Sequence, residues 1–109
     1  MTITATFSNG FTDTYKGQRD VRAAWAIIRT SDNVTINSGH SLDRVKAAKT
    51  AEGHLHETAC DLGLTGHPLR YFEGRSVRDT AAKRRAKAAH NAERLAFIRS
   101  LVRIEIVDL

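Results

Sequence analysis

Alternating apolar and polar side chains near the N-terminus predict a β-hairpin over residues 2–15, with β-branched and aromatic residues on both arms of an Asn9-Gly10 turn. A two-residue loop would put Phe7 and Phe11 on opposite faces of this hairpin. A three-residue loop puts both on one face, so we predict that loop, with Gly10 in the left-handed conformation. The pairs on the apolar face are then Phe7 with Phe11 and Ile3 with Tyr15.

A second hairpin is predicted from the apolar run 23–30, which by itself fits either a buried strand or a short helix. The polar turn at 31–33 and the alternation at 34–36 favour the strand, and 37–39 has the composition of a loop that ends the sheet. Further along the chain, residues 103–107 alternate apolar and charged side chains. We therefore expect a last strand there, added to the same sheet.

Two stretches carry apolar side chains at helical spacing. The first spans 42–62, with Ser41 as its N-cap. The second spans 76–102, where Ser76 is the N-cap and no Gly or Pro interrupts a run of strong helix formers. Residues 64–75 between them are predicted to form a loop. The inward stripe of the first helix consists of Val45, Ala48, Ala51, Leu55, Ala59 and Leu62.

The apolar stripe of helix 76–102 is uneven along its length. Its N-terminal half presents only alanines and is interrupted by Arg84 and Asn91. Burying an alanine removes much less apolar surface than burying a leucine, because each buried methylene contributes ~0.8 kcal/mol. We therefore predict a helix that docks by its second half and projects its first half away from the core. The large residues of the docked half are Leu95, Ile98 and Val102.

These elements predict a single α+β domain over residues 1–109. In chain order they are ββββααβ: an antiparallel sheet built from the two hairpins and the C-terminal strand, with two helices packed on one of its faces. A chain of this length with 41% hydrophobic and 27% charged residues has enough apolar surface for a modest core.

The chain is basic, and the excess charge is concentrated in one part of it. Its 17 Lys and Arg against 12 Asp and Glu give a net charge of +5 and a pI near 9.9. Residues 1–41 carry a net charge of +1, residues 42–63 carry −1 and residues 64–109 carry +5. Such a distribution favours acidic partners, either nucleic acid or an acidic protein surface.

The densest group of cations is Lys83-Arg84-Arg85-Ala86-Lys87, within the predicted helix 76–102. At helical spacing these side chains spread over roughly half of the circumference or more. Such a surface can contact phosphates with release of counterions, or pair with carboxylates through bidentate arginine bonds. The binding residues that we predict are Arg75, Arg78, Lys83, Arg84, Arg85, Lys87 and Arg94.

The histidines and the single cysteine raise the question of a metal site, because imidazole and thiolate both bind zinc. On a helix, His54 and His56 are about 200° apart and cannot hold one ion together. His56 and Cys60 are four residues apart and could do so, with His67 as the obvious third ligand. We expect no metal and no cofactor, with these side chains solvated or flanking the helix.

The sequence carries no phosphate-binding glycine loop, no nucleophile elbow and no paired-carboxylate pattern. His40 lies between Ser38 and Ser41 in ordinary turn sequence, so we expect a protein that is not an enzyme. One cysteine excludes an internal disulfide, and the N-terminus lacks the pattern of a signal peptide. No apolar run approaches the ~18 residues of a membrane helix. These features predict a cytoplasmic protein.

Residues 11–62, in the order strand, strand, strand, helix, resemble the double-stranded RNA-binding domain. The resemblance rests on residues 38–49, where a basic helix N-terminus follows the third strand. It implies that Arg44, Lys46 and Lys49 contact phosphates. The chain departs from that family because no helix precedes the strands.

As a whole, the chain resembles small phage-encoded anti-CRISPR proteins, many of which are single α+β domains of this size with a Thr-rich first strand, here residues 1–6. The resemblance implies a non-catalytic phage or mobile-element protein that binds a CRISPR effector complex and blocks target-DNA recognition or nuclease recruitment. Its partner is then an acidic protein surface or a ribonucleoprotein complex in the host cytoplasm. The alternative is a nucleic-acid-binding module that uses helix 76–102. Phe97 and Leu101 lie off the main apolar stripe and offer a second apolar contact, either with the core or with another subunit in a homodimer.

Overall fold

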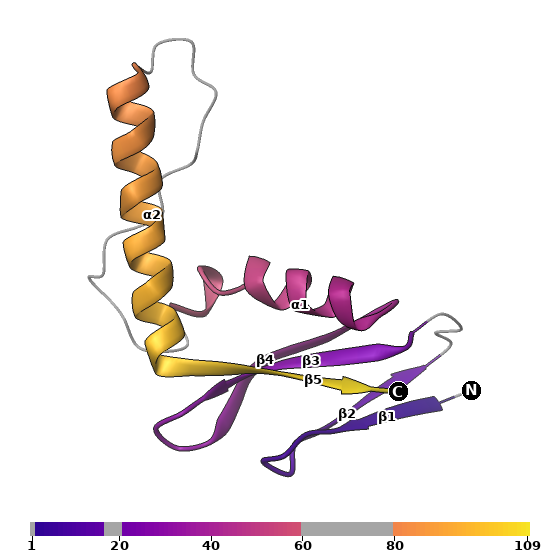
Figure 1. The fold of residues 1–109 in the computed structure, drawn as a ribbon. Coiled ribbons are helices and arrows are strands. Elements are labelled where there is room, and N and C mark those ends of the chain that lie inside the picture. Colours follow the sequence, from indigo (N-terminus) through magenta and orange to yellow (C-terminus); the bar gives the residue numbers. More distant parts are fainter. Residues whose placement is uncertain (1, 17–20, 60–79) are drawn as a thin grey trace.

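The computed structural model describes residues 2–16, 21–59 and 80–109 (Figure 1). Within these residues the chain has an α+β fold, as predicted. The predicted loop 64–75 and the predicted N-cap Ser76 lie outside the described residues. The elements are, in chain order, β1 (Thr2–Thr6), β2 (Thr12–Lys16), β3 (Ala23–Arg29), β4 (Val34–Ser41), α1 (Arg44–Gly53), the short 3-10 turn η1 (Glu57–Ala59), α2 (Ala81–Leu101) and β5 (Val102–Asp108).

The strands form two antiparallel sheets, so the prediction of one continuous sheet is wrong. Strand β3 lies at the centre of a three-stranded sheet in the order β4-β3-β5, and β1 pairs with β2 alone. The β1-β2 hairpin packs against one face of the larger sheet, and α1 covers the other face (Figure 1). The fold therefore has three layers, with β3 in the middle.

The composition of β3 explains why the hairpin forms a separate layer. All residues from Ala23 to Ile28 are buried, so both faces of this strand are apolar and both need a cover. Trp25 and Ile27 face α1, whereas Ala26 and Ile28 face the hairpin residues. A hairpin added at the edge of the sheet would have left one of these faces exposed to water.

The first hairpin has the predicted three-residue loop. Its register pairs Ile3 with Tyr15, and the backbone N–H of Phe7 donates to the carbonyl of Phe11 at 2.9 Å. Gly10 has a φ of 87°, in the left-handed region that glycine adopts without strain. The two phenylalanine rings lie on the same side with their centroids 5.9 Å apart.

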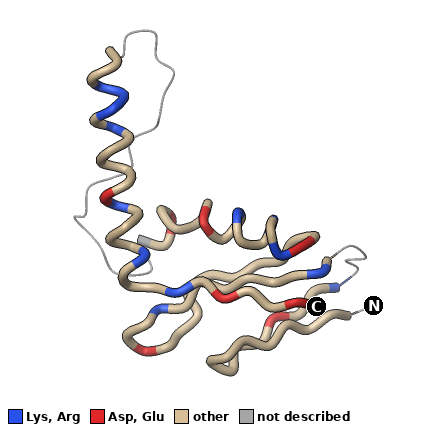
Figure 2. The backbone as a smooth tube through the Cα atoms, viewed as in Figure 1, with Lys and Arg blue, Asp and Glu red and all other residues tan. Residues whose placement is uncertain are grey.

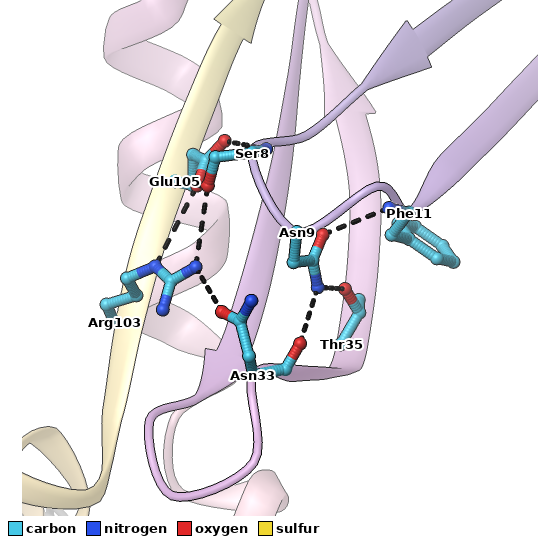
Figure 3. A network of polar contacts seen from close by, with 7 residues as sticks. All are labelled: Ser8, Asn9, Phe11, Asn33, Thr35, Arg103 and Glu105. Atoms are coloured by element: carbon cyan, nitrogen blue, oxygen red, sulfur yellow. Dashed lines mark hydrogen bonds and ion pairs between the residues drawn. The ribbon is translucent and has the colours of Figure 1, made fainter.

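A network of polar contacts joins the loop of this hairpin to the larger sheet (Figure 3). The backbone N–H of Ser8 donates to Oε1 of Glu105 on β5 at 2.6 Å. The Nδ2 group of Asn9 donates to the carbonyl of Asn33 and to Oγ1 of Thr35, both at 2.9 Å. These bonds hold the two layers together from their polar rim, while the apolar cluster holds them from inside.

Strand β4 continues to Ser41, so the prediction that residues 37–39 end the sheet is wrong. Gly39 pairs with Trp25 in the register of β3 and β4. A Cβ atom at Gly39 would lie 2.6 Å from Cζ2 of the indole, closer than real carbon atoms approach. This glycine therefore serves close packing inside a strand, where the sequence pattern suggested a turn.

Helix α1 begins later and ends earlier than the predicted 42–62. Its N-cap is Asp43, which accepts a hydrogen bond from the backbone N–H of Lys46 at 2.8 Å, where Ser41 had been predicted. Ala47, Ala51 and Leu55 face the core, with Ala48 half-buried. Val45 is 66% exposed, so its place on the inward stripe is a wrong prediction. Ala59 and Leu62 of that stripe have side chains outside the described part of the chain.

Helix α2 leads directly into β5 and stands away from the sheet at that junction (Figure 1). Its N-cap is Thr80, whose Oγ1 accepts from the backbone N–H of Lys83 at 3.2 Å. The predicted bounds 76–102 are therefore wrong: the helix begins at Ala81, and Val102 is the first residue of β5. Ile98 is fully buried, and Leu95 and Leu101 pack against the same core as Trp25. The helix thus docks by its second half, as its apolar stripe predicted. Across the described ranges, no helix combines the length and the apolar character needed to cross a membrane.

Candidate functional site

Positive charge in the described structure is concentrated on α2 (Figure 2). This helix carries six basic and one acidic residue, for a net charge of +5. The other described residues carry seven basic and seven acidic side chains, which cancel. The body of the fold is therefore neutral overall, and α2 is the element that can attract an anionic partner over a distance.

The second half of α2 anchors the helix through more than its apolar residues. Asn91 and Arg94 are buried beside Ile98, and Nη2 of Arg94 donates to the carbonyl of His56 at 3.1 Å. Arg94 therefore belongs to the anchor, and its predicted place in an exposed basic surface is wrong. The spacing of these three residues on one helical face is the sequence signal that identifies the anchor.

The first half of α2 presents its cations to solvent. Lys83, Arg84 and Arg85 are exposed, and their side chains make no hydrogen bond or ion pair within the described residues. We call these three residues the basic tip. Lys87 is half-buried and engaged in a contact, so it stands apart from the tip. The other two predicted binding residues, Arg75 and Arg78, lie outside the described structure.

The charges of the basic tip oppose the electrostatics of their own helix. The N-terminus of a helix carries the positive end of its dipole, so cations in the first turns are unfavourable there. The first turn of α2 contains no acidic residue, and Lys83 follows only two residues after the helix begins. Lys83 and Lys87 also lie four residues apart, where like charges repel. The fold therefore maintains this charge at a cost in stability.

The side chains of the basic tip point in different directions around α2. Consecutive helical residues are about 100° apart, so Lys83, Arg84 and Arg85 together cover roughly 200° of the circumference. Alanines lie next to them on the helix surface, and no acidic residue occurs between Ala81 and Ala92. The result is a slim helical segment with cations on more than one side.

Comparisons with known proteins give no further guide to the site. No family model, no curated protein and no solved structure matches the chain.

An open hollow of about 410 Å³ lies where the end of α1 meets the middle of α2. Three of its seven lining residues are Gly or Ala, and Glu52, another of the seven, forms an ion pair with Arg99 of α2. Its lining residues are Glu52, Gly53, His56, Ala88, Asn91, Ala92 and Leu95.

The residues considered for a metal site have other surroundings in the structure. The ring of His54 stacks on Trp25 with centroids 5.2 Å apart, and its Nδ1 lies 2.9 Å from Oε2 of Glu57. Cys60 and His67 are outside the described residues. Among the residues that are described, no three His, Cys, Asp or Glu side chains gather to hold an ion.

Ser38 and His40 face the β1-β2 hairpin from neighbouring positions on β4. The hydroxyl of Ser38 donates to Oδ2 of Asp13 at 2.9 Å, and the ring of His40 packs on that of Tyr15 at 4.2 Å. The Tyr15 hydroxyl lies 3.0 Å from Oδ2 of Asp13, and burial together with this carboxylate raises the pKa of Tyr15 well above its usual value. These side-chain contacts of Ser38 and His40 join β4 to the hairpin.

The segment that resembles the double-stranded RNA-binding domain does not form one unit. Strand β2 belongs to a different sheet from β3 and β4, so the three strands before α1 are not one sheet. Arg44, Lys46 and Lys49 are exposed on α1, and Arg44 pairs with Asp108 at 3.2 Å. These cations lie on an element other than α2 and provide a matched comparison for the basic tip (Figure 2).

The two residues predicted to form a homodimer contact differ in their surroundings. Leu101 packs on the core of its own chain, whereas Phe97 is 43% exposed. The homodimer stays a prediction, and it rests on Phe97 more than on Leu101.

Proposed function

We propose that this protein is a non-catalytic inhibitor, encoded by a phage or another mobile element, that binds a host defence complex through its basic tip. The observation that carries the proposal is the exposure of Lys83, Arg84 and Arg85 without a hydrogen bond or ion pair in the described part of the chain. The resemblance to anti-CRISPR proteins supplies the class of target, a CRISPR effector complex.

The charge of the basic tip restricts which part of such a complex it meets. CRISPR effectors hold the guide–target duplex in a positively charged channel, whose walls repel a cationic helix. The attractive surfaces are the nucleic acid itself and acidic patches of the protein subunits. A rigid domain bound at either place blocks target recognition or nuclease recruitment by occupying the space that another component needs.

The anchor of α2 favours this use of the tip. Because Ile98 and Arg94 fix the second half of the helix, the first half is presented in one orientation before any partner arrives. Arg84 and Arg85 can each form bidentate bonds to phosphate or carboxylate groups, and hydrogen bonds to charged groups contribute about 1.5–3 kcal/mol each.

A phage-plating experiment tests the proposal. Bacteria with an active CRISPR system and a phage-targeting guide would express the wild-type protein, the variant R84E/R85E or the control variant K46E/K49E. Both variants remove two exposed cations and add two carboxylates, so they change the net charge equally. We expect the wild type and K46E/K49E to let the phage form plaques, and R84E/R85E to leave defence intact.

Two outcomes would count against the proposal. If R84E/R85E protects the phage as well as the wild type, the basic tip is not the binding surface. If K46E/K49E alone loses inhibition, the binding surface lies on α1, at the cations that the RNA-binding resemblance indicates. Circular dichroism at 222 nm on each purified variant shows whether the helices remain folded.

A further inference from the structure

We propose that the partner of the basic tip is duplex DNA and that the first half of α2 enters its major groove with little preference for sequence. This inference rests on the proposed function because it takes the basic tip as the binding surface. It goes further in naming the partner and the way it is engaged. The acidic protein surface considered above becomes an alternative that the experiment below can detect.

The directions of the three cations favour a groove over a flat surface. A helix lying on a flat acidic face contacts it through one side, which is about a third of its circumference. Lys83, Arg84 and Arg85 cover roughly 200°, so a flat partner leaves at least one of them unused. A groove with phosphates along both walls can meet all three together.

The shape of the helix also fits this groove. The B-DNA major groove is about 12 Å wide and about 8.5 Å deep and admits an α-helix. A helix with its side chains measures about 10–12 Å across, and α2 is slimmer at its tip because alanines surround the cations. From Ala81 to Ala89 only Lys87 is even half-buried, so this stretch has its surface available.

The anchor holds the body of the fold far enough away for the tip to enter. At 1.5 Å per residue, α2 rises roughly 15 Å between Ala81 and Asn91, the first of its buried residues. This distance exceeds the depth of the groove. The described residues outside α2 carry no net charge, so within the described part of the chain the attraction comes from this helix.

The composition of the tip indicates contact with phosphates. Between Ala81 and Ala89 the only hydrogen-bonding side chains are those of Lys and Arg, which can bind phosphates or the O6 and N7 atoms of guanine, whereas alanine forms no hydrogen bond to a base. Cations directed to the two walls of a groove reach phosphates, which position a protein on DNA without reporting the sequence. We therefore expect similar affinities for duplexes of different sequence.

The test compares anionic ligands of different shape. Fluorescence anisotropy would measure binding of the full-length protein to a 20-base-pair DNA duplex, an RNA duplex of the same sequence, one DNA strand and polyglutamate. Because the major groove of A-form RNA is too narrow and deep for side chains to read, we expect the DNA duplex to bind most tightly. A second DNA duplex of shuffled sequence should bind equally well.

Salt dependence counts the contacts. Each phosphate contact lowers the slope of log K against log[salt] by about 0.9, so three contacts predict a slope near −2.7 and a loss of roughly 40-fold between 50 and 200 mM salt. In the variant R84A/R85A the slope should become shallower, at about −0.9, because one contact remains. Alanine keeps the helix intact, and the control K46A/K49A should retain the wild-type slope.

The outcomes separate this inference from the proposed function. Equal binding to DNA duplex, RNA duplex and single strand would overturn entry into the groove, because charge alone would explain it. Tighter binding to polyglutamate than to DNA, with inhibition lost in R84E/R85E, would overturn the DNA partner and leave the inhibitor proposal standing. Selective, salt-dependent binding to duplex DNA by a protein that does not inhibit defence would support the inference and refute the inhibitor proposal.

Discussion

Lys83 offers a direct test of whether the basic tip is maintained at a cost in stability. The substitution Lys83→Glu places a carboxylate at the third residue of α2, three positions after the N-cap Thr80. A Thr N-cap followed three residues later by Glu is a capping box, in which the Thr side chain accepts from the backbone N–H of the Glu and the Glu side chain accepts from the backbone N–H of the Thr. The change should therefore stabilise the start of the helix while it weakens binding.

The magnitude follows from two local terms. Exchanging a cation for an anion in the first turn reverses an interaction with the helix dipole that is worth about 0.3–1 kcal/mol at an exposed position. It also turns the repulsion between positions 83 and 87 into an attraction, worth about 0.2–0.5 kcal/mol for each sign. Because each interaction changes sign, both values double and together they predict about 1–3 kcal/mol, which corresponds to roughly 5–150-fold more protection of the tip amides from exchange.

Hydrogen exchange measured by mass spectrometry on a peptide containing residues 84–90 is the suitable assay, because the tip can open while the core stays folded. The control is Lys49→Glu, which makes the same charge change at an exposed position in the middle of α1. Faster exchange in Lys83→Glu than in the wild type would refute the reasoning, since it would mean that the cation already has a stabilising partner. In 1 M salt the difference in exchange rate between Lys83→Glu and the wild type should shrink.

Three further predictions concern the packing of the layers. Gly39→Ala should lower the free energy of unfolding by about 1–3 kcal/mol in urea titrations, because its Cβ would meet the buried Trp25 ring at 2.6 Å. The matched control is Gly53→Ala, whose Cβ would have no atom within 4 Å, and equal stability of the two variants would contradict this packing. Asn9→Asp should lower the free energy of unfolding by about 1–3 kcal/mol at pH 7, because it removes the Nδ2 group that donates both hydrogen bonds. The control Asn37→Asp keeps the oxygen that accepts from the backbone N–H of Ser38 and should change the stability little. Unchanged stability in both variants would contradict this role of Asn9. The hydrogen bond from Ser8 holds the pKa of Glu105 below its usual value of 4.5, so the stability that this carboxylate contributes is present above about pH 4.5 and is lost as the pH falls through the lower pKa of the folded state. The urea midpoint of Glu105→Gln should accordingly change less between pH 6 and pH 3 than that of the wild type. If the two midpoints change equally with pH, this carboxylate plays no such role.

Sequence reasoning succeeds in this protein where a feature depends on neighbours along the chain. The three-residue loop follows from keeping Phe7 and Phe11 on one face together with a glycine at the left-handed position. The docking of α2 by its second half follows from where leucine and isoleucine replace alanine along the helix. The exposure of the basic tip, Lys83, Arg84 and Arg85, follows from the same pattern.

The features that required the tertiary structure all depend on which distant element covers which face. Alternation shows that a strand has an apolar side, but two sheets stacked face to face and one wide sheet give the same alternation. Arg94 and Asn91 look like surface residues because they are polar, yet they are buried where α2 meets the turn that contains His56. Gly39 looks like a turn residue until Trp25 is seen against it.

What the sequence by itself determined is thus the loop of the first hairpin, the presence of the two helices, and the imbalance of charge and bulk along α2. The tertiary structure alone decided the three-layer arrangement and divided the predicted cations into an exposed tip and a buried anchor. The physical reason is that hydrophobic burial is non-directional: it requires each apolar surface to be covered, and the packing of distant elements selects the cover.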